Sequence, residues 1–337
     1  MSELNIAVLG AGIVGLTTAF ELKTKFRNAN INVISDKFNE DTTSYVAAGL
    51  FRPGSSFSGP TEELTRKWIK DSYNYWDDLR NTSEGNKAGV TQISGYIFSS
   101  QYPNIVRNNY LEKLVPLYRK VTEEELTLCP GEWKYGCFFT TLLTQSTEYL
   151  PWITLKLQTA GVNFFTSTID SFTDINKKYD VIVNCTGLGA KFLCNDNKLV
   201  PMRGQVLKVD APWIKTFFYG DYDTYIIPGF NCVTLGGCRQ YDSYDLRINK
   251  YDGLSIKERC ESLVPSLKGA KLISEKVGLR PHRDPVRVEK DIKTINDRKI
   301  KIVHNYGHGG YGVTTAPGTS LYAVDLVTEI LSGGSKL

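Results

Sequence analysis

The 337-residue sequence contains no apolar stretch that approaches the length needed to span a lipid bilayer. Its first residues lack the positive charge and the long apolar core of a secretory signal peptide, so we expect none. The seven cysteines form no Cys-x-x-Cys pair and no metal-ligand spacing, which predicts reduced thiols and no metal site. The net charge of +4 is spread along the chain, so the sequence indicates neither nucleic-acid binding nor a membrane-binding face.

The sequence does contain a βαβ pattern at its start. Residues 6–9 form a short apolar run that is typical of a buried parallel strand. Residues 13–23 carry apolar side chains at helical spacing, and residues 31–34 predict a second strand. Together these elements predict a complete βαβ unit of about thirty residues.

The turn between that first strand and the helix follows the Gly-x-Gly-x-x-Gly pattern of dinucleotide-binding folds. Gly10 permits the tight turn, Gly12 lets the backbone approach a pyrophosphate, and Gly15 allows close packing of helix on strand. The helix N-terminus supplies N–H groups and a positive dipole end, and Asp36 stands where an acidic side chain accepts ribose hydroxyls. This pattern predicts a bound dinucleotide without distinguishing NAD from FAD. The turn comprises Gly10, Ala11, Gly12, Ile13, Val14 and Gly15.

Eight segments spread over nearly the whole chain together resemble the D-amino-acid oxidase family of FAD enzymes. Several of them are long and chemically specific, and they occur in the family's order. The resemblance implies that the dinucleotide is FAD. The segments are VLGAGIVGL (8–16), TTSYVAAGL (42–50), DVIVNCTGL (180–188), RGQVLKVDAPW (203–213), TYIIPG (224–229), VTLGG (233–237), VGLRPHR (277–283) and HNYGHGGYGVT (304–314).

The family pattern also implies which residues bind FAD. The glycine turn and the acidic residue after the second strand are assigned to the diphosphate and the ribose. A second helix N-terminus near the end of the chain is assigned to the flavin edge, where N–H donors would stabilise negative charge on the reduced ring. The residues implied beyond the glycine turn are Asp36, Lys37, Thr42, Thr43, Ser44, Gly49, Leu50, Ile169, Gly309, Gly310, Tyr311, Gly312, Val313 and Thr314.

Segments typical of nucleotide-binding folds lie at both ends and in the middle of the chain, so we expect two interleaved domains. The fold class is α/β. Residues 1–50, 142–200 and 278–337 are predicted to form a Rossmann-like FAD-binding domain. Residues 51–141 and 201–277 are predicted to form an α+β substrate and interface domain with a mostly antiparallel sheet.

The resemblance implies oxidation of an amino acid by hydride transfer from Cα to flavin N5, giving 2-oxo acid, ammonia and, with dioxygen, hydrogen peroxide. Arg280 matches the family's carboxylate clamp, since a guanidinium offers two parallel donors to a carboxylate. Tyr225 is implied to add its hydroxyl to the same carboxylate, and the carbonyl of Gly310 to accept the amine. No side chain is assigned as a general base. The histidines, which are His282, His304 and His308, are expected to be structural.

Two features favour an acidic D-amino acid, D-aspartate or D-glutamate, as the substrate. Arg239 stands where family members that act on neutral substrates carry an aromatic residue, and a second guanidinium suits a second carboxylate. The segment 213–225 is too short to hold the lid of the neutral-substrate enzymes. Arg52 either points into the pocket, where it would bind substrate by sharing the side-chain carboxylate with Arg239, or lies on a solvated loop, and the sequence leaves both open.

Three alternatives remain open from the sequence. They are an oxidase of neutral D-amino acids, an NAD-dependent dehydrogenase and a flavoprotein without catalytic activity. The final tripeptide, Ser335-Lys336-Leu337, has the form of a peroxisomal address, so we expect the peroxisomal matrix as the location and the import receptor as a partner. The sequence predicts no oligomeric state.

Overall fold

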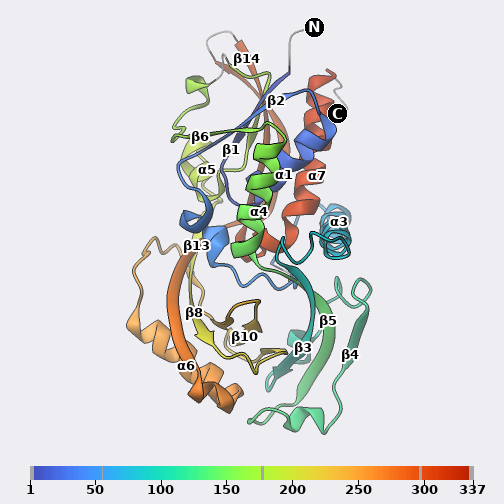
Figure 1. Cartoon of the computed structure of the whole chain (residues 1–337), viewed down its shortest axis with the longest axis vertical. Coiled ribbons are helices and arrows are strands. Elements are labelled where there is room, and N and C mark those ends of the chain that lie inside the picture. The colour runs from blue at the N-terminus through green and yellow to red at the C-terminus, as the bar shows by residue number, and fades with distance from the viewer. Residues whose placement is uncertain (1–3, 55, 176–177, 296–297, 334–337) are drawn as a thin grey trace.

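The computed structural model describes residues 4–54, 56–175, 178–295 and 298–333. Within these ranges one continuous sheet of 14 strands runs through the molecule, from an antiparallel part to a parallel part. Figure 1 shows the two parts at opposite ends of an elongated chain, with α1, α4 and α7 beside the parallel strands and α6 beside the antiparallel ones. The strand order is β4-β5-β3-β9-β10-β11-β8-β13-β14-β7-β1-β2-β6, with β12 paired to β8.

The parallel part contains the predicted βαβ unit. Its central strands are short, apolar and almost wholly buried, because helices and loops cover both faces of the sheet. Helix α1 packs against α4 and α7. The elements of this part are β1 (Asn5–Leu9), α1 (Ile13–Lys25), β2 (Asn30–Ser35), α4 (Ser146–Thr159), β6 (Asn163–Thr166), β7 (Val181–Asn184), β14 (Arg298–His308) and α7 (Gly312–Leu331).

In the antiparallel part the two ten-residue strands, β3 and β5, alternate buried and partly exposed side chains over much of their length, as strands with one covered face do. One pairing, β3 with β9, is parallel. The elements of this part are β3 (Val90–Ser99), β4 (Leu117–Lys120), β5 (Tyr135–Thr144), β8 (Val200–Asp210), β9 (Phe217–Tyr219), β10 (Tyr225–Pro228), β11 (Val233–Gly236), β12 (Gln240–Tyr241) and α6 (Lys250–Leu263).

Strand β13 (Lys271–Ile295) joins the two parts. It pairs with β8 as far as His282 and with β14 beyond that point, and the register shifts between His282 and Arg287. Arg280 therefore lies where the antiparallel part meets the parallel part. The parallel strands β1, β2 and β7 end toward the same region, which is where sheets of this class bind ligands. The predicted α/β fold with an added antiparallel sheet is confirmed, while the predicted domain boundaries stay a prediction.

Helix α3 (Glu62–Arg80) contacts both parts, α7 on one side and β3 and β5 on the other. Thr61 caps it by accepting the Leu64 N–H at 3.2 Å. The helix packs against α7 so closely that a Cβ added at Gly318 would lie 2.0 Å from the Trp68 carbonyl oxygen. The short helical turns are η1 (Asn39–Asp41), α2 (Thr43–Val46), η2 (Pro103–Val106), η3 (Glu125–Thr127), η4 (Phe172–Asp174), η5 (Gly187–Gly189), α5 (Ala190–Leu193), η6 (Pro265–Gly269) and η7 (Gly309–Tyr311).

Among the described residues, no helix is both long and apolar enough to cross a membrane.

A buried carboxyl on α1 makes stability depend on pH. Burial raises the pKa of Glu21 from 4.5 to about 7. The native state therefore favours the protonated acid. The contribution of Glu21 to the free energy of unfolding is complete below pH 4.5 and is lost as pH rises through about 7. In Glu21→Gln we expect the fall in the free energy of unfolding between pH 5 and pH 8 to shrink by about 1–3 kcal/mol.

Urea unfolding of the holoprotein at the two pH values measures that difference. The exposed Glu63→Gln on α3 is the matched control and should keep the wild-type pH dependence. An unchanged pH dependence in Glu21→Gln would show that Glu21 titrates as an ordinary surface carboxyl.

Candidate functional site

A cavity of about 1750 Å³ lies where the two parts of the sheet meet. This volume exceeds the range of roughly 300–1,000 Å³ that is typical of small-ligand pockets, so it has room for a dinucleotide and a small substrate together. One end of the cavity is lined by the turns that follow β1, β2 and β7. The other end is lined by side chains from β9, β10 and β13.

The glycine turn after β1 forms the floor of the first end. Gly10 has a φ of +99°, and a Cβ there would lie 2.4 Å from the carbonyl oxygen of Cys185. A Cβ at Gly15 would lie 1.9 Å from the Gly10 carbonyl oxygen. Among the described residues lining the cavity, the turn contributes Gly10 through Val14, while Gly15 lies behind them and lets α1 pack on the turn.

The polar turn after β2 lines the next stretch of the cavity. Asp36 and Lys37 are exposed on the cavity wall directly beyond β2. The hydroxyls of the following turn bind the protein itself. Thr42 donates to the Asn39 carbonyl at 2.6 Å, Thr43 donates to the Leu279 carbonyl at 3.2 Å, and Ser44 accepts the Ile13 N–H at 3.0 Å. These side chains therefore shape the turn, which lines the cavity.

Backbone close to the middle of the cavity comes from two further segments. Gly49 has a φ of +79°, and a Cβ there would lie 1.9 Å from the Thr144 carbonyl oxygen. At the start of α7, the indole N–H of Trp76 donates to the Thr314 carbonyl at 3.2 Å and fixes the helix N-terminus against the cavity. Of the other residues predicted to bind cofactor, those lining the cavity are Leu50, Ile169, Gly309, Gly310, Tyr311, Gly312 and Val313.

These residues fit FAD. The glycine positions leave a cradle that a Cβ would fill, and the helix N-terminus behind it suits a diphosphate. Asp36 suits a ribose. The N-terminus of the 20-residue α7 brings a second positive dipole end to the cavity, which suits a flavin ring. The part of the chain that the structure describes has no cluster of three or more metal-ligating side chains.

The substrate end of the cavity contains Arg280 and Tyr225 in slots that glycine residues create. A Cβ at Gly204 would lie 2.3 Å from two nitrogens of the Arg280 guanidinium. A Cβ at Gly236, the cross-strand partner of Tyr225, would lie 2.0 Å from the Tyr225 ring. One guanidinium nitrogen of Arg280 donates to the Cys238 carbonyl at 3.0 Å. Its other nitrogens donate to no protein group within the described ranges and can meet an anionic ligand.

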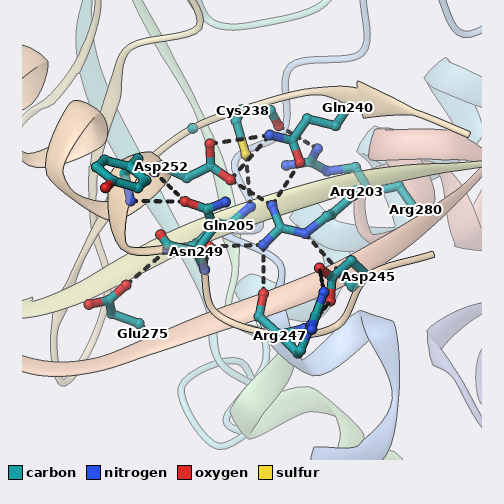
Figure 2. Close-up of polar contacts among 12 residues, drawn as sticks. Arg203, Gln205, Cys238, Gln240, Asp245, Arg247, Asn249, Asp252, Glu275 and Arg280 are labelled. Atoms are coloured by element: carbon teal, nitrogen blue, oxygen red, sulfur yellow. Dashed lines mark hydrogen bonds and ion pairs between the residues drawn. The ribbon is translucent and has the colours of Figure 1, made fainter. Parts of the chain in front are cut away.

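A buried polar network supports this clamp from behind (Figure 2). At its centre is Arg203 on β8, which is 2% exposed and pairs with Asp252 at 2.8 Å. Its guanidinium also donates to the carbonyls of Asp245 and Arg247, both at 2.7 Å, and to the side-chain oxygens of Gln240 at 2.9 Å and Gln205 at 3.1 Å. A fully hydrogen-bonded buried charge rigidifies its surroundings. The network therefore fixes the segment from β12 to α6, next to the Cys238 carbonyl that receives Arg280.

Arg239 and Arg52 line the same end of the cavity but differ in exposure and in their partners. Arg239 is 45% exposed and forms an ion pair with Asp223 at 3.0 Å. The Nε of Arg52 is buried and has no hydrogen-bond partner within the described ranges. The Arg52 guanidinium lies 4.9 Å from the centre of the Tyr219 ring. The structure therefore places Arg52 in the cavity wall, the first of the two positions that the sequence left open.

Sequence reasoning missed Tyr219 and Gly204. Tyr219 on β9 is the cross-strand partner of Tyr225, and the two ring centres are 5.6 Å apart. Burial raises the pKa of the Tyr219 hydroxyl, so it stays a hydrogen-bond donor at neutral pH. In the sequence, Gly204 is marked only by its place in the segment RGQVLKVDAPW (203–213). The family resemblance implies no role for that residue.

Two of the three histidines are buried in polar contacts away from solvent. His308 lies 2.9 Å from the Thr319 hydroxyl, and burial lowers its pKa to about 3. His304 lies 3.3 Å from Asp291, and burial lowers its pKa as well. Both rings are therefore neutral at physiological pH. His282 lines the cavity beside Gly309.

The glycine slot under the clamp allows a test of its role. Gly204→Ala should push the Arg280 guanidinium aside, because a Cβ at 2.3 Å leaves no room and the flexible side chain yields first. We expect kcat/KM to fall about 10–100-fold through a higher KM, which corresponds to a loss of about 1.5–3 kcal/mol. Steady-state kinetics measure this fall. Gly269→Ala, where an added Cβ meets nothing within 4 Å, is the control. Unchanged kinetics in Gly204→Ala would contradict the assigned position of the clamp.

Comparison with known proteins agrees with this geometry. Residues 5–326 match the family model described as FAD dependent oxidoreductase, DAO. The protein named D-aspartate oxidase from Homo sapiens is 39% identical over 98% of this chain and 96% of its own length. D-aspartate oxidase 1 from Caenorhabditis elegans is 34% identical over 98% of this chain and 99% of its own length.

Solved structures show the same fold at low sequence identity. Glycine oxidase from Geobacillus kaustophilus superimposes with a TM-score of 0.79 at 16% identity, covering 100% of this chain and 96% of that one. L-proline dehydrogenase from P. horikoshii superimposes with a TM-score of 0.77 at 18% identity, covering 100% of this chain and 95% of that one. Fold, cavity and family match agree, and the chain belongs to the DAO family of FAD dependent oxidoreductase enzymes.

Proposed function

We propose that this FAD-dependent enzyme oxidises acidic D-amino acids, D-aspartate and D-glutamate. The observation that carries the proposal is the set of three guanidinium groups, those of Arg280, Arg239 and Arg52, around the substrate end of one cavity. Because Arg239 already pairs with Asp223, a substrate with one carboxylate would leave Arg52 or Arg280, both partly buried, without an anionic partner, which is costly. The relatives named D-aspartate oxidase support the same substrate class.

In this proposal the chain's own residues bind and orient the amino acid. Arg280 and the Tyr225 hydroxyl bind the α-carboxylate, and the Gly310 carbonyl accepts a hydrogen bond from the amine. These contacts turn Cα toward the flavin end of the cavity, and such positioning lowers the barrier by supplying the right geometry in advance. With FAD bound, the hydride from Cα would pass to the flavin, and dioxygen would take those two electrons, with two protons, to become hydrogen peroxide; water would hydrolyse the resulting imine to 2-oxo acid and ammonia.

The second candidate is an oxidase of neutral D-amino acids. It is supported by the protein named D-amino acid oxidase from Dugesia ryukyuensis, which is 30% identical over 97% of this chain. The Arg239–Asp223 ion pair also favours it, because that pair already neutralises one of the three cations.

Initial rates of peroxide release separate the two candidates. We expect the purified holoenzyme to release peroxide faster with D-aspartate or D-glutamate than with D-alanine at equal concentration, and to release none with L-aspartate. A faster rate with D-alanine would establish the neutral specificity.

We also propose the peroxisomal matrix as the location, with the import receptor as a partner. The support is the tripeptide Ser335-Lys336-Leu337, which lies outside the described residues, and the usefulness of keeping a peroxide-forming enzyme apart. Microscopy of the chain with and without this tripeptide tests the location. An unchanged distribution after its removal would refute it.

A further inference from the structure

We propose that Arg52 and Tyr219 form the subsite for the side-chain carboxylate of the substrate, a subsite that the sequence pattern assigned to Arg239. This inference rests on the proposed function, because only an acidic substrate has that carboxylate. It adds one tyrosine to the site and changes which arginine carries the specificity.

The backbone next to Arg52 is anchored to β5, so the start of its side chain stays at the wall of the cavity. Leu50 forms a β-bridge with Leu143 on β5. Phe51 is anchored on both sides, since its N–H donates to the Leu142 carbonyl at 2.8 Å and its carbonyl accepts the Thr141 hydroxyl at 2.8 Å. The next residue, Arg52, projects its guanidinium over the ring of Tyr219.

The donors of this pair lack acceptors. Arg52 has a buried Nε without a partner, and within the ranges that the structure describes neither its guanidinium nor the Tyr219 hydroxyl donates to any protein group. The Tyr219 ring also lies beside that of Tyr225, with ring centres 5.6 Å apart. A cation and a hydroxyl that share a cavity without an acceptor suit a carboxylate, which accepts from both.

Arg239 is in the opposite state. It already has a carboxylate partner in Asp223, and both side chains are more than one-third exposed. A substrate carboxylate could use Arg239 only by competing with Asp223 and with water. Exposed ion pairs contribute little free energy, so we assign Arg239 to the rim of the cavity and Arg52 to the binding contact.

The two tyrosines beside these arginines lie close together, with ring centres 5.6 Å apart. Tyr219 and Tyr225 are cross-strand partners on β9 and β10, so their side chains lie on the same face of the sheet. Each tyrosine has an arginine beside it, Arg52 for Tyr219 and Arg280 for Tyr225. The cavity wall thus repeats an arginine–tyrosine pair at the distance of neighbouring strands, and each pair can take one end of a four-carbon diacid.

The test uses two ligands without an amine, succinate and propionate, which are aspartate and alanine without their amino groups. They are titrated against FAD-loaded enzyme by the change that they cause in flavin absorbance. We expect Arg52→Met to weaken the binding of succinate about 10–100-fold and that of propionate less than about 3-fold. This is the size of effect expected for loss of one charge-assisted contact. Tyr219→Phe should weaken succinate by about 5-fold. The comparison variant is Arg239→Met, with an expected loss for succinate below about 5-fold.

Kinetics with D-aspartate and D-alanine complete the test. Arg52→Met should lower kcat/KM for D-aspartate in proportion to succinate affinity and leave that for D-alanine unchanged. A larger effect of Arg239→Met than of Arg52→Met on succinate, or equal weakening of succinate and propionate by Arg52→Met, would overturn the inference. Wild-type enzyme that prefers D-alanine would instead refute the proposed function. If Arg52→Met loses FAD, the Tyr219→Phe variant alone decides the inference. Equal weakening of succinate and propionate binding in Tyr219→Phe would then overturn it.

Discussion

Replacement of Arg280 by methionine is expected to lower kcat/KM for D-aspartate by a factor on the order of 10²–10³. Removing one partner of a hydrogen-bonded charge pair costs about 2–5 kcal/mol, because the other charge stays desolvated and unpaired. The clamp is also what turns Cα toward the flavin end of the cavity, so kcat should fall together with the rise in KM. Steady-state kinetics over a wide range of D-aspartate concentration measure both.

Two further measurements make this prediction specific. FAD content should match that of the wild type, because the structure places Arg280 at the substrate end and the glycine turn at the other. Arg280→Lys should recover only part of the loss, since lysine keeps the charge without the parallel pair of donors. Wild-type kcat/KM in Arg280→Met would remove Arg280 from the site.

Gly10→Ala is expected to produce protein without FAD. The residue has a φ of +99°, which disfavours any side chain, and a Cβ there would lie 2.4 Å from backbone at Cys185. Gly10 and Cys185 both belong to the floor of the cofactor cradle. The glycine turn must therefore move to relieve the clash, and the N–H groups that would bind the diphosphate move with it. We expect the yellow colour of bound flavin to be absent after purification, and the thermal transition to fall because ligand stabilisation is lost.

The matched control is Gly161→Ala, in the turn between α4 and β6. Gly161 has a φ of +79°, yet an added Cβ there meets nothing within 4 Å. It therefore isolates the cost of the backbone conformation, about 1 kcal/mol, from the clash with Cys185. Full FAD occupancy in Gly10→Ala would show that the cofactor does not rest on this turn.

The parts of the molecule that the sequence predicted well are those determined by local pattern. The βαβ unit follows from residues 6–34, because strand, turn and helix each have a short-range signature. Arg280 was identified by resemblance rather than by pattern, since no periodicity distinguishes it from Arg283 or Arg287 three and seven residues later. The structure shows the reason for its position, which is the shift of β13 from β8 to β14 next to it.

The parts that the sequence could not predict depend on contacts between distant strands. Gly204 matters because β8 places it under Arg280, and Tyr219 matters because β9 places it opposite Tyr225. Neither pairing is visible along the chain. The state of Arg239 was equally hidden, because its partner Asp223 lies in the turn before β10 and the ion pair forms only in three dimensions.

Anaerobic mixing of the FAD-loaded enzyme with single amino acids tests the central claim most directly, because the visible absorbance of the flavin reports reduction without any second enzyme. D-aspartate should bleach that absorbance faster than D-alanine at equal concentration, and L-aspartate should leave it unchanged. Bleaching that is faster with D-alanine, or no bleaching by either D-amino acid, would contradict the assignment of this cavity to acidic D-amino acids.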